Sequence, residues 1–295
     1  MVGMRILFLL LMLEFALVAQ KADLKGIYDI HAHSDPDSVP RSIDALTLTR
    51  LMALKGFGGV VLKNHYESTA GLAYLASQQA PGLMIFGGVA LNRAVGGINV
   101  AAVERMALVK GGLGKVVWMP TFDSENEVKF RKEARPFVSV SNNGTLLPEV
   151  LAVIDVIAKN DFVLATGHST PAETKMMLQA AGQRGVKRMV VTHPVIAPVL
   201  MGMEDMKWCA SQGAYLEFVS NAIIGTAPSM TAKQFVDAIR AVGVEHVILS
   251  SDLGQESNPI HTEGWAQLFT ALEKEGMTVA EIDRMAKTNS GKLLR

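Results

Sequence analysis

A repeated alternation of short apolar runs and amphipathic segments limits the folds open to this 295-residue chain. From Gly26 onward, eight apolar or β-branched runs alternate with helical patterns, and a glycine stands where most of the helices should end. Eight strands, each followed by a helix, within roughly 270 residues are typical of a (β/α)8 TIM barrel, a single-domain α/β fold. The predicted strands are Gly26–His31, Gly59–Lys63, Met84–Val89, Lys115–Met119, Phe162–Thr166, Arg188–Thr192, Ala214–Phe218 and His246–Ser250.

A doubly wound open sheet is the alternative α/β fold, and it usually carries a glycine-rich phosphate loop after its first strand. Here the first strand runs into HAHSDPDSVP instead, so the barrel is favoured. The longest irregular stretch, residues 121–145, is polar and follows the fourth strand, which predicts a functional loop or a lid. The predicted helices are Ile43–Lys55, Ser68–Gln79, Val100–Lys110, Pro148–Lys159, Pro171–Arg184, Met203–Ser211, Thr231–Val242, His261–Glu275 and Thr278–Thr288.

Charge and cysteine content exclude several classes of protein. Lys plus Arg and Asp plus Glu each total 28, so the chain has no net positive charge with which to bind nucleic acid, and no nucleic-acid partner is expected. A single cysteine cannot form an internal disulfide or a cysteine-rich zinc site. That residue, Cys209, lies on a predicted helix beside methionines and is expected to pack in the core.

The N-terminus is typical of a secretory signal peptide, because Arg5 precedes the apolar run Ile6–Leu13 and small residues follow near Ala19 and Ala22. We therefore expect a signal peptide at residues 1–19, the barrel domain at residues 23–295, and export to the periplasm or the extracellular space. A buried N-terminal helix is the alternative, and the protein would be cytoplasmic if this segment is not cleaved. The run is too short for a membrane span, and none is expected in the mature protein.

Histidines and carboxylates stand at the predicted C-terminal ends of strands, where barrel enzymes place their active-site residues. The first strand ends Asp29-Ile30-His31-Ala32-His33, and the two-residue period of a strand puts Asp29, His31 and His33 on one face. Two imidazoles at this spacing can bind one divalent cation, and Asp29 could orient one of them. Other strand ends carry Lys63, His65, His168, His193, Glu217 and Asp252.

This arrangement resembles the amidohydrolase superfamily of metal-dependent barrel enzymes, which carry His-x-His on strand one, a histidine on strands five and six, and an aspartate on strand eight. The C-terminal segment Lys287–Leu294 also resembles an ending common in the family, so the resemblance covers the whole barrel. Many binuclear members bridge their two metals with a lysine or glutamate from strand three or four, and neither strand here supplies one. One metal ion is therefore favoured over two. The matching residues are His31, His33, His168, His193 and Asp252.

The resemblance implies that these five residues hold a divalent metal, most simply zinc, with manganese, iron or cobalt as alternatives. In the mononuclear arrangement, His193 lies near the bound water or substrate instead of ligating. Asp252 or His193 is expected to take a proton from water, and Lys63 or the metal to stabilise the developing oxyanion. Lys63 or Glu217 could also replace the missing bridge. Predicted substrate contacts are His65, which could instead be a ligand or a filler, Asn92, Arg93, Trp118 and Glu217.

The predicted function is hydrolysis of an amide, lactone or ester in a small molecule by a metal-activated water. The alternative is a lyase, a metal-dependent decarboxylase or hydratase that acts on a small carboxylic acid. The single-metal ligand set and the absence of a metal-bridging residue on strands three and four favour this alternative more than a standard binuclear site would. A barrel that binds without turnover is a third reading, and the intact ligand set argues against it. Of the two remaining histidines, His246 is expected at the bottom of the barrel and His261 at a solvated helix start. A small-molecule substrate is expected, and a homo-oligomer is left open.

Overall fold

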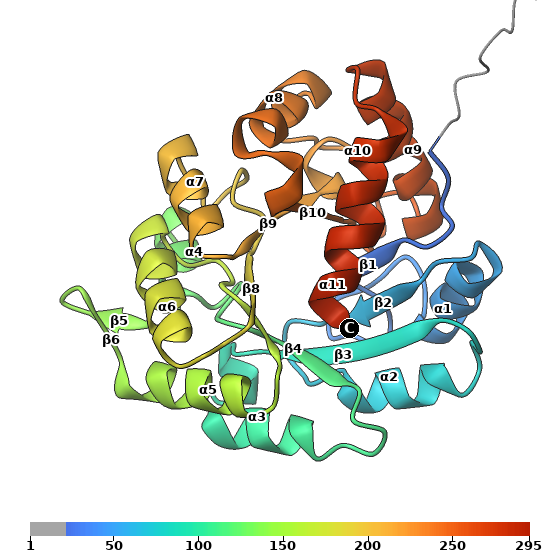
Figure 1. Ribbon diagram of the computed structural model, residues 1–295. Coiled ribbons are helices and arrows are strands. Elements are labelled where there is room, and N and C mark those ends of the chain that lie inside the picture. Colours follow the sequence, from blue (N-terminus) through green and yellow to red (C-terminus); the bar gives the residue numbers. More distant parts are fainter. Residues whose placement is uncertain (1–21) are drawn as a thin grey trace, which may run out of the picture.

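The computed structural model describes residues 22–295, so the predicted signal peptide at residues 1–19 lies outside the described residues. Eight parallel strands follow one another in chain order around one sheet (Figure 1). All eight lie where the sequence predicts a strand, and the predicted barrel is confirmed. Its strands are β1 (Tyr28–Ala32), β2 (Gly59–Leu62), β3 (Met84–Ala90), β4 (Gly114–Trp118), β7 (Val163–Ala165), β8 (Arg188–Val191), β9 (Tyr215–Val219) and β10 (Val247–Ser250).

The first and last strands meet only at their C-terminal ends. The backbone N–H of His33 donates to the carbonyl of Leu253 at 2.9 Å, and that of Asp252 donates to the carbonyl of His31 at 2.8 Å. The Asp29 carboxylate reinforces this seam, because it accepts from the backbone N–H of Ser251 at 3.0 Å. The seam that nearly closes the barrel therefore also brings together residues from the two ends of the domain.

Helices surround the strands in the expected alternation. Helix α8 illustrates the packing, since Phe235, Val236, Ile239 and Val242 recur on one face and are buried against the barrel. Burial of each such side chain contributes about 1.5–3 kcal/mol before the entropy of ordering is counted. The surrounding helices are α1 (Ala45–Leu54), α2 (Ala70–Ser77), α3 (Val100–Ala107), α5 (Pro148–Lys159), α6 (Pro171–Gln183), α7 (Met203–Ser211), α8 (Ala232–Val242) and α9 (His261–Lys274).

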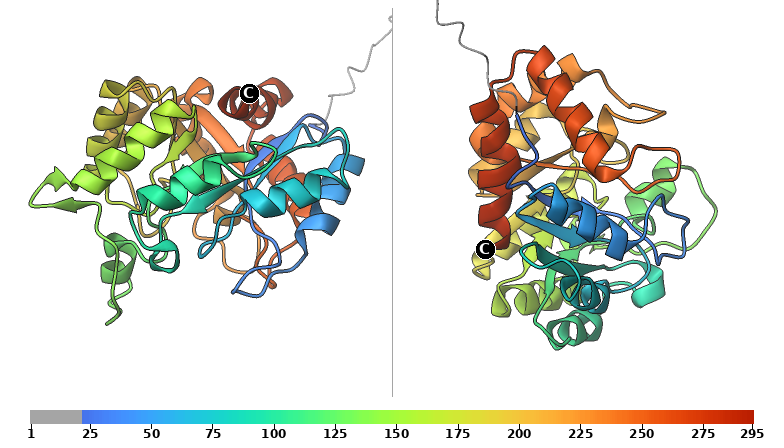
Figure 2. Two further views of the ribbon diagram at one scale, coloured as in Figure 1. Left: turned by 90° about the horizontal axis from the view of Figure 1, so that it is seen from below. Right: turned by 90° about the vertical axis from the view of Figure 1, so that its right-hand side faces the viewer.

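The C-terminal segment closes the bottom of the barrel. It runs through α10 (Val279–Asp283), the π-helical turn η4 (Arg284–Asn289) and α11 (Ser290–Leu294). Leu293 and Leu294 pack with interior barrel residues such as Ile30 and Val61. Figure 2 shows these helices at one end of the barrel, while the loop after β1 and helix α4 (Glu125–Phe130) lie at the opposite end. That opposite end is the mouth.

The stretch at 121–145, expected to be irregular, is partly ordered into regular elements. It contains α4, capped by the Ser124 side chain, and the hairpin of β5 (Ser141–Asn142) and β6 (Thr145–Leu146). Three short turns, η1 (Arg93–Val95), η2 (Ser220–Ala222) and η3 (Val244–His246), complete the fold. Cys209 is fully buried in the core, as predicted, and burial raises the pKa of its thiol to about 12. Across residues 22–295, no helix has the length and apolar character needed to cross a membrane.

Candidate metal centre

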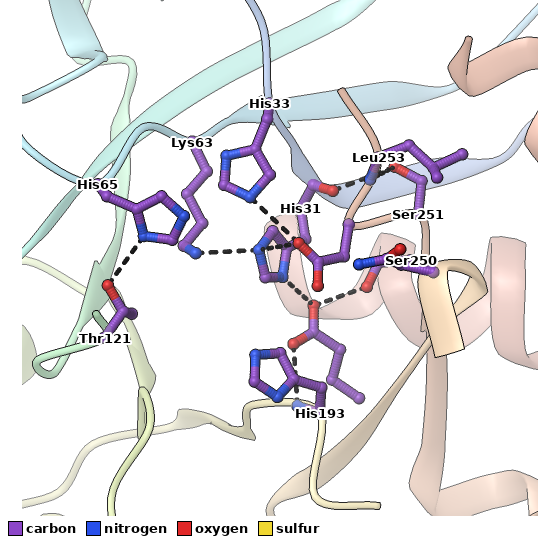
Figure 3. A network of polar contacts seen from close by, with 12 residues as sticks. His31, His33, Lys63, His65, Thr121, His193, Ser250, Ser251 and Leu253 are labelled. Atoms are coloured by element: carbon purple, nitrogen blue, oxygen red, sulfur yellow. Dashed lines mark hydrogen bonds and ion pairs between the residues drawn. The ribbon is translucent and has the colours of Figure 1, made fainter. Parts of the chain in front are cut away.

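Three side chains converge at the seam between β1 and β10. His31 Nε2 and His33 Nε2 each lie 3.1 Å from Asp252 Oδ1, and one ligand atom of each residue falls within 4.8 Å of the others. All three residues are buried. Figure 3 shows the rings of His31 and His33 turned toward this shared carboxylate. The structure thus brings together three of the five residues predicted to ligate a metal.

Glu217, on β9, fixes the orientation of His31. Its Oε1 lies 3.0 Å from His31 Nδ1 and accepts from the Ser250 hydroxyl at 2.6 Å, while its Oε2 accepts from the backbone N–H of His193 at 3.3 Å. A carboxylate only accepts, so Nδ1 of His31 donates to Glu217, and Nε2, which faces Asp252 Oδ1 and Lys63 Nζ, is the ring nitrogen left to bind a cation. A buried carboxylate behind a histidine is the usual support of a metal ligand.

His168 and His193 form a second group beside the first. His168 Nδ1 donates to Glu127 Oε2 at 2.8 Å, which leaves the lone pair of its Nε2 facing His193 Nε2 at 3.2 Å. The rings of His193 and His31 lie 6.1 Å apart, centroid to centroid. The five predicted ligands are therefore arranged as a cluster of three and an adjacent pair, and His168 lies in the pair rather than with His31, His33 and Asp252.

The backbone at the strand ends is unusual where it presents these residues. Asp252 and His193 have positive φ angles of 50° and 24°, a conformation that costs free energy and is concentrated at functional sites. Two glycines allow the close approach of neighbouring strand ends: a Cβ on Gly167 would lie 2.3 Å from the Met119 carbonyl oxygen, and one on Gly254 would lie 2.3 Å from the His33 carbonyl oxygen. Gly167 directly precedes His168, so the fit of this turn sets the position of that candidate ligand.

Electrostatics keep most of the imidazoles neutral. Burial lowers the pKa of His33 well below its usual range, lowers that of His168, and lowers that of His193 to about 3. Burial also acts to lower the pKa of His31, but the Asp252 and Glu217 carboxylates outweigh it and raise that pKa. Despite its burial, Asp252 has a pKa held well below the usual value by the His31 and His33 rings. The site thus offers the neutral imidazoles of His33, His168 and His193 beside an ionised carboxylate, while His31 is the imidazole on which the surrounding carboxylates favour the charged form.

Lys63 reaches the same point from β2. Its Nζ lies 3.0 Å from His31 Nε2 (Figure 3). The same Nζ lies 5.4 Å from the centroid of the Trp118 ring. The lysine is almost fully buried, and burial lowers the pKa of its ammonium to about 8. Lys63 therefore lies in direct contact with a candidate ligand, a position compatible with the stabilising or bridging role predicted from its strand-end position.

His65 lines the site between two aromatic neighbours. Its ring stacks on that of Phe122 with 3.9 Å between centroids and on that of His33 with 4.8 Å. Its Nδ1 lies 2.9 Å from Thr121 Oγ1. Burial, and then the charge of Lys63, lower its pKa well below the usual value.

A cavity of about 330 Å³ opens above these side chains. Its wall includes His33, Lys63, His65, His168, His193 and Asp252, together with Glu127, Arg41 and Arg131. Larger cavities exist among the described residues, including one of about 730 Å³ beside the β5–β6 hairpin, but none of them contains the histidine cluster. The small cavity is the place where a substrate would meet the candidate metal centre.

Four predicted substrate contacts do not lie on this cavity wall. Asn92 is buried and holds together the loops after β2 and β4, and Arg93 is exposed at the start of η1. Trp118 fills the barrel interior below the cavity, because it ends β4 with its ring inward, and Glu217 is fully buried behind His31. The structure therefore does not place these four residues on the wall of this cavity, because an inward side chain one layer below a strand end packs in the barrel interior or supports its neighbours.

Two further expectations are also corrected. Asp29 does not orient an imidazole, because its carboxylate accepts from the backbone N–H groups of His31 and Ser251 and from Trp265 Nε1 at 2.8 Å. His261 is not at a solvated helix start: it is fully buried, although it opens α9. The carbonyls of His33 and Leu253 are near its ring, but neither ring nitrogen makes a hydrogen bond of good geometry. His246 lies at the bottom of the barrel, as expected.

Sequence reasoning missed several cavity residues and supports, among them Glu127, Thr121 and Arg41. Glu127 lies in α4, inside the stretch that the sequence predicts to be irregular, and Thr121 begins that stretch. Arg41 lies in the loop after β1, where it pairs with Asp37 at 2.6 Å. The S-x-x-E pattern of Ser124 and Glu127 is a capping-box signal that could have placed a helix start there. Nothing local could have paired Glu127 with His168.

The residues fit a divalent cation. Glu217 and Glu127 engage Nδ1 of His31 and of His168, so Nε2 of each ring is directed toward the cluster, and His33 Nδ1 and His193 Nδ1 are buried without a hydrogen-bond partner. A donor set of histidine nitrogens with one aspartate carboxylate suits zinc and its first-row neighbours. Lys63 is the one buried cation in contact with the cluster among the described residues, and its lowered pKa eases the loss of its proton.

Comparison with known proteins agrees with this fold. An amidohydrolase from Pseudomonas aeruginosa is 12% identical, with a TM-score of 0.62 over 92% of this chain and 96% of that one. An N-acetyl-D-glucosamine-6-phosphate deacetylase from Mycobacterium smegmatis is 14% identical, with a TM-score of 0.61 over 92% and 76%. A phosphotriesterase homology protein from Escherichia coli is 14% identical, with a TM-score of 0.60 over 92% and 100%. At such identities the likeness shows a shared fold.

The sequence itself matches one described family and no curated protein. The match covers residues 26–217, from β1 to β9, and so includes four of the five predicted ligands. The predicted resemblance to amidohydrolases is confirmed at the level of the barrel. The chain belongs to the family of unknown function DUF6282, and it has the fold of the amidohydrolase structures.

Proposed function

We propose that this protein is a metal-dependent hydrolase that cleaves an amide, lactone or ester bond in a small molecule. The observation that carries the proposal is the buried convergence of His31 Nε2, His33 Nε2 and Asp252 Oδ1 below a cavity. The names of the structural neighbours, an amidohydrolase, a deacetylase and a phosphotriesterase homology protein, support hydrolysis over the lyase alternative. Export from the cytoplasm remains part of the proposal and rests on the N-terminal sequence alone.

Each group of the site has a role in this proposal. A divalent cation, with zinc the first choice, would be held by the cluster of three and by the His168–His193 pair, and would supply the Lewis acidity that makes water a nucleophile near neutral pH. Asp252 is placed to accept the proton of the attacking water, because its low pKa keeps it ionised and it lines the cavity. His193 is the second candidate for that proton, and Lys63 is placed to support developing negative charge.

The test combines metal analysis with product analysis on the purified protein. Zinc-loaded enzyme is assayed on lactones, N-acyl amino acids, esters and simple carboxylates; carboxylates are included because Arg41 and Arg131 line the cavity. We expect hydrolysis of at least one class, bound zinc, and loss of both zinc and activity in His31→Ala. Release of CO2 without uptake of water would favour the lyase instead. A protein that binds no divalent metal, with activity unaffected by His31→Ala, would refute the proposal.

A further inference from the structure

The buried amide of Asn92 is oriented without ambiguity. Its Oδ1 accepts from the backbone N–H of Thr121 at 2.9 Å and from that of Asp123 at 3.1 Å. Its Nδ2 donates to the carbonyl of His65 at 2.8 Å and to Thr121 Oγ1 at 2.7 Å. Rotating the amide by 180° would set two donors against two backbone N–H groups, so this assignment is the one in which every bond is satisfied.

The Thr121 hydroxyl must therefore donate to His65. Its oxygen already accepts from Asn92, and the side chain is fully buried, so its own proton needs an acceptor inside the protein. Among the described residues, the acceptor within reach is His65 Nδ1 at 2.9 Å. If Nδ1 carried a proton, in either the other tautomer or the imidazolium, the Thr121 hydroxyl proton would be left buried without a partner, which is unfavourable.

The second nitrogen of His65 reaches the cavity. Nε2 has no hydrogen-bond partner among the described residues, yet it is not one of the buried unpartnered nitrogens, and His65 lines the cavity wall. Figure 3 shows the ring with one nitrogen toward Thr121 and the other toward the side where Lys63 and His33 lie. Stacking on Phe122 and His33 holds the ring plane in place.

We propose that the Asn92–Thr121–His65 relay locks His65 as the Nε2–H tautomer, which makes it a fixed hydrogen-bond donor to an oxygen of the substrate beside the metal centre. The ligand class is an oxygen that gains negative charge in the reaction, a carbonyl or phosphoryl oxygen. A donor held by stacking and by a buried relay needs no reorganisation when that charge develops, which is the property that makes such donors effective. The substrate half of this inference rests on the proposed hydrolase function; the tautomer half does not.

The tautomer is tested directly by nitrogen NMR of the histidine rings in the full protein. We expect His65 Nδ1 at the shift of an unprotonated nitrogen and Nε2 at that of a protonated one, assigned by the signals that disappear in His65→Phe. A protonated Nδ1 in the wild-type protein would overturn the inference. In Thr121→Val, which cannot donate, we expect a mixture of tautomers, whereas Thr121→Ser keeps the hydroxyl and serves as the matched control. An unchanged tautomer in Thr121→Val would equally contradict the relay.

The donor role is tested with inorganic phosphate as an oxyanion probe on zinc-loaded protein, which requires no turnover. Phosphate should shift the His65 Nε2 signal, and His65→Phe should weaken phosphate binding by about tenfold or more while keeping its zinc, since one hydrogen bond to a charged acceptor is removed. Unchanged phosphate affinity in a zinc-loaded His65→Phe variant would overturn the donor role. On any substrate found by the panel, kcat should fall about 10²–10³-fold in His65→Phe. The failure of every substrate would count against the hydrolase proposal, while the NMR and phosphate results would still decide this one.

Discussion

Glu217 offers the sharpest test of how the candidate metal centre is built. The change Glu217→Gln keeps the size of the side chain and removes its charge. In the wild-type protein Oε1 receives the His31 Nδ1 proton and the Ser250 hydroxyl proton, while Oε2 receives the His193 backbone N–H. A glutamine has one acceptor oxygen and one donor NH2 group, so it cannot serve all three donors.

Both orientations of the glutamine amide disrupt the hydrogen bonds of the site. If its oxygen stays on His31 and Ser250, its NH2 group faces the backbone N–H of His193, and two donors meet in a fully buried position. If the amide is turned over, NH2 donates to His31 Nδ1, the proton moves to Nε2, and the lone pair that should face the metal is lost. Loss of an outer carboxylate typically costs 10–100-fold in metal affinity, or about 1.4–2.7 kcal/mol, and the tautomer argument favours the upper end.

The measurement is zinc affinity by competition with a chromophoric chelator near pH 7, with circular dichroism to confirm folding. Glu204→Gln, a change at an exposed residue, is the control and should leave the affinity unchanged. Glu127→Gln removes the carboxylate behind His168 and should weaken binding only if the His168–His193 pair also holds metal. A folded Glu217→Gln protein that binds zinc within about threefold of wild type would refute the claim that Glu217 orients a metal ligand.

Three further predictions concern catalysis, metal and pH. Asp252→Asn should lower kcat about 10²–10⁴-fold on any substrate found, because the group placed to accept a proton is lost; metal analysis on the same sample separates this from loss of the ion. Zinc at about 100 times its Kd should raise the free energy of unfolding by about 2.7 kcal/mol in denaturant titrations, relative to protein from which a chelator has removed the metal. The change His33→Ala should abolish most of that gain. Burial lowers the pKa of His261 to about 4, so the folded protein favours the neutral ring more strongly than the unfolded chain does. The stability that depends on this neutral ring is fully present above pH 6.5 and is lost as the pH falls from 6.5 to 4. The loss in the free energy of unfolding amounts to about 3 kcal/mol. Urea titrations at pH 7.5 and 4.5 should therefore show a smaller loss of stability in His261→Leu, while the exposed His246→Gln should follow the wild type; equal pH dependence in all three would contradict the prediction.

Local sequence patterns were sufficient for the barrel and for the identity of the candidate ligands. Strand and helix periods are properties of neighbouring residues, and eight repeats in order leave few arrangements other than a barrel. Once the strands are parallel, their C-terminal ends must share one rim. His31, His33, His168, His193 and Asp252 therefore had to lie near one another, and the structure places them there.

The tertiary structure decided how those residues are grouped and supported. Glu127 meets His168 across 41 positions and Glu217 meets His31 across 186, and no periodicity records such pairs. Strand-end position does not separate the cavity wall from the layer below it, so Trp118 and Glu217, which the sequence predicts as substrate contacts, lie in the interior of the barrel. Alternation along a strand determines whether a side chain points into or out of the barrel. Its level along the barrel axis, relative to side chains of other strands, depends on how β1 and β10 close the barrel. That closure depends on contacts between residues far apart in the chain.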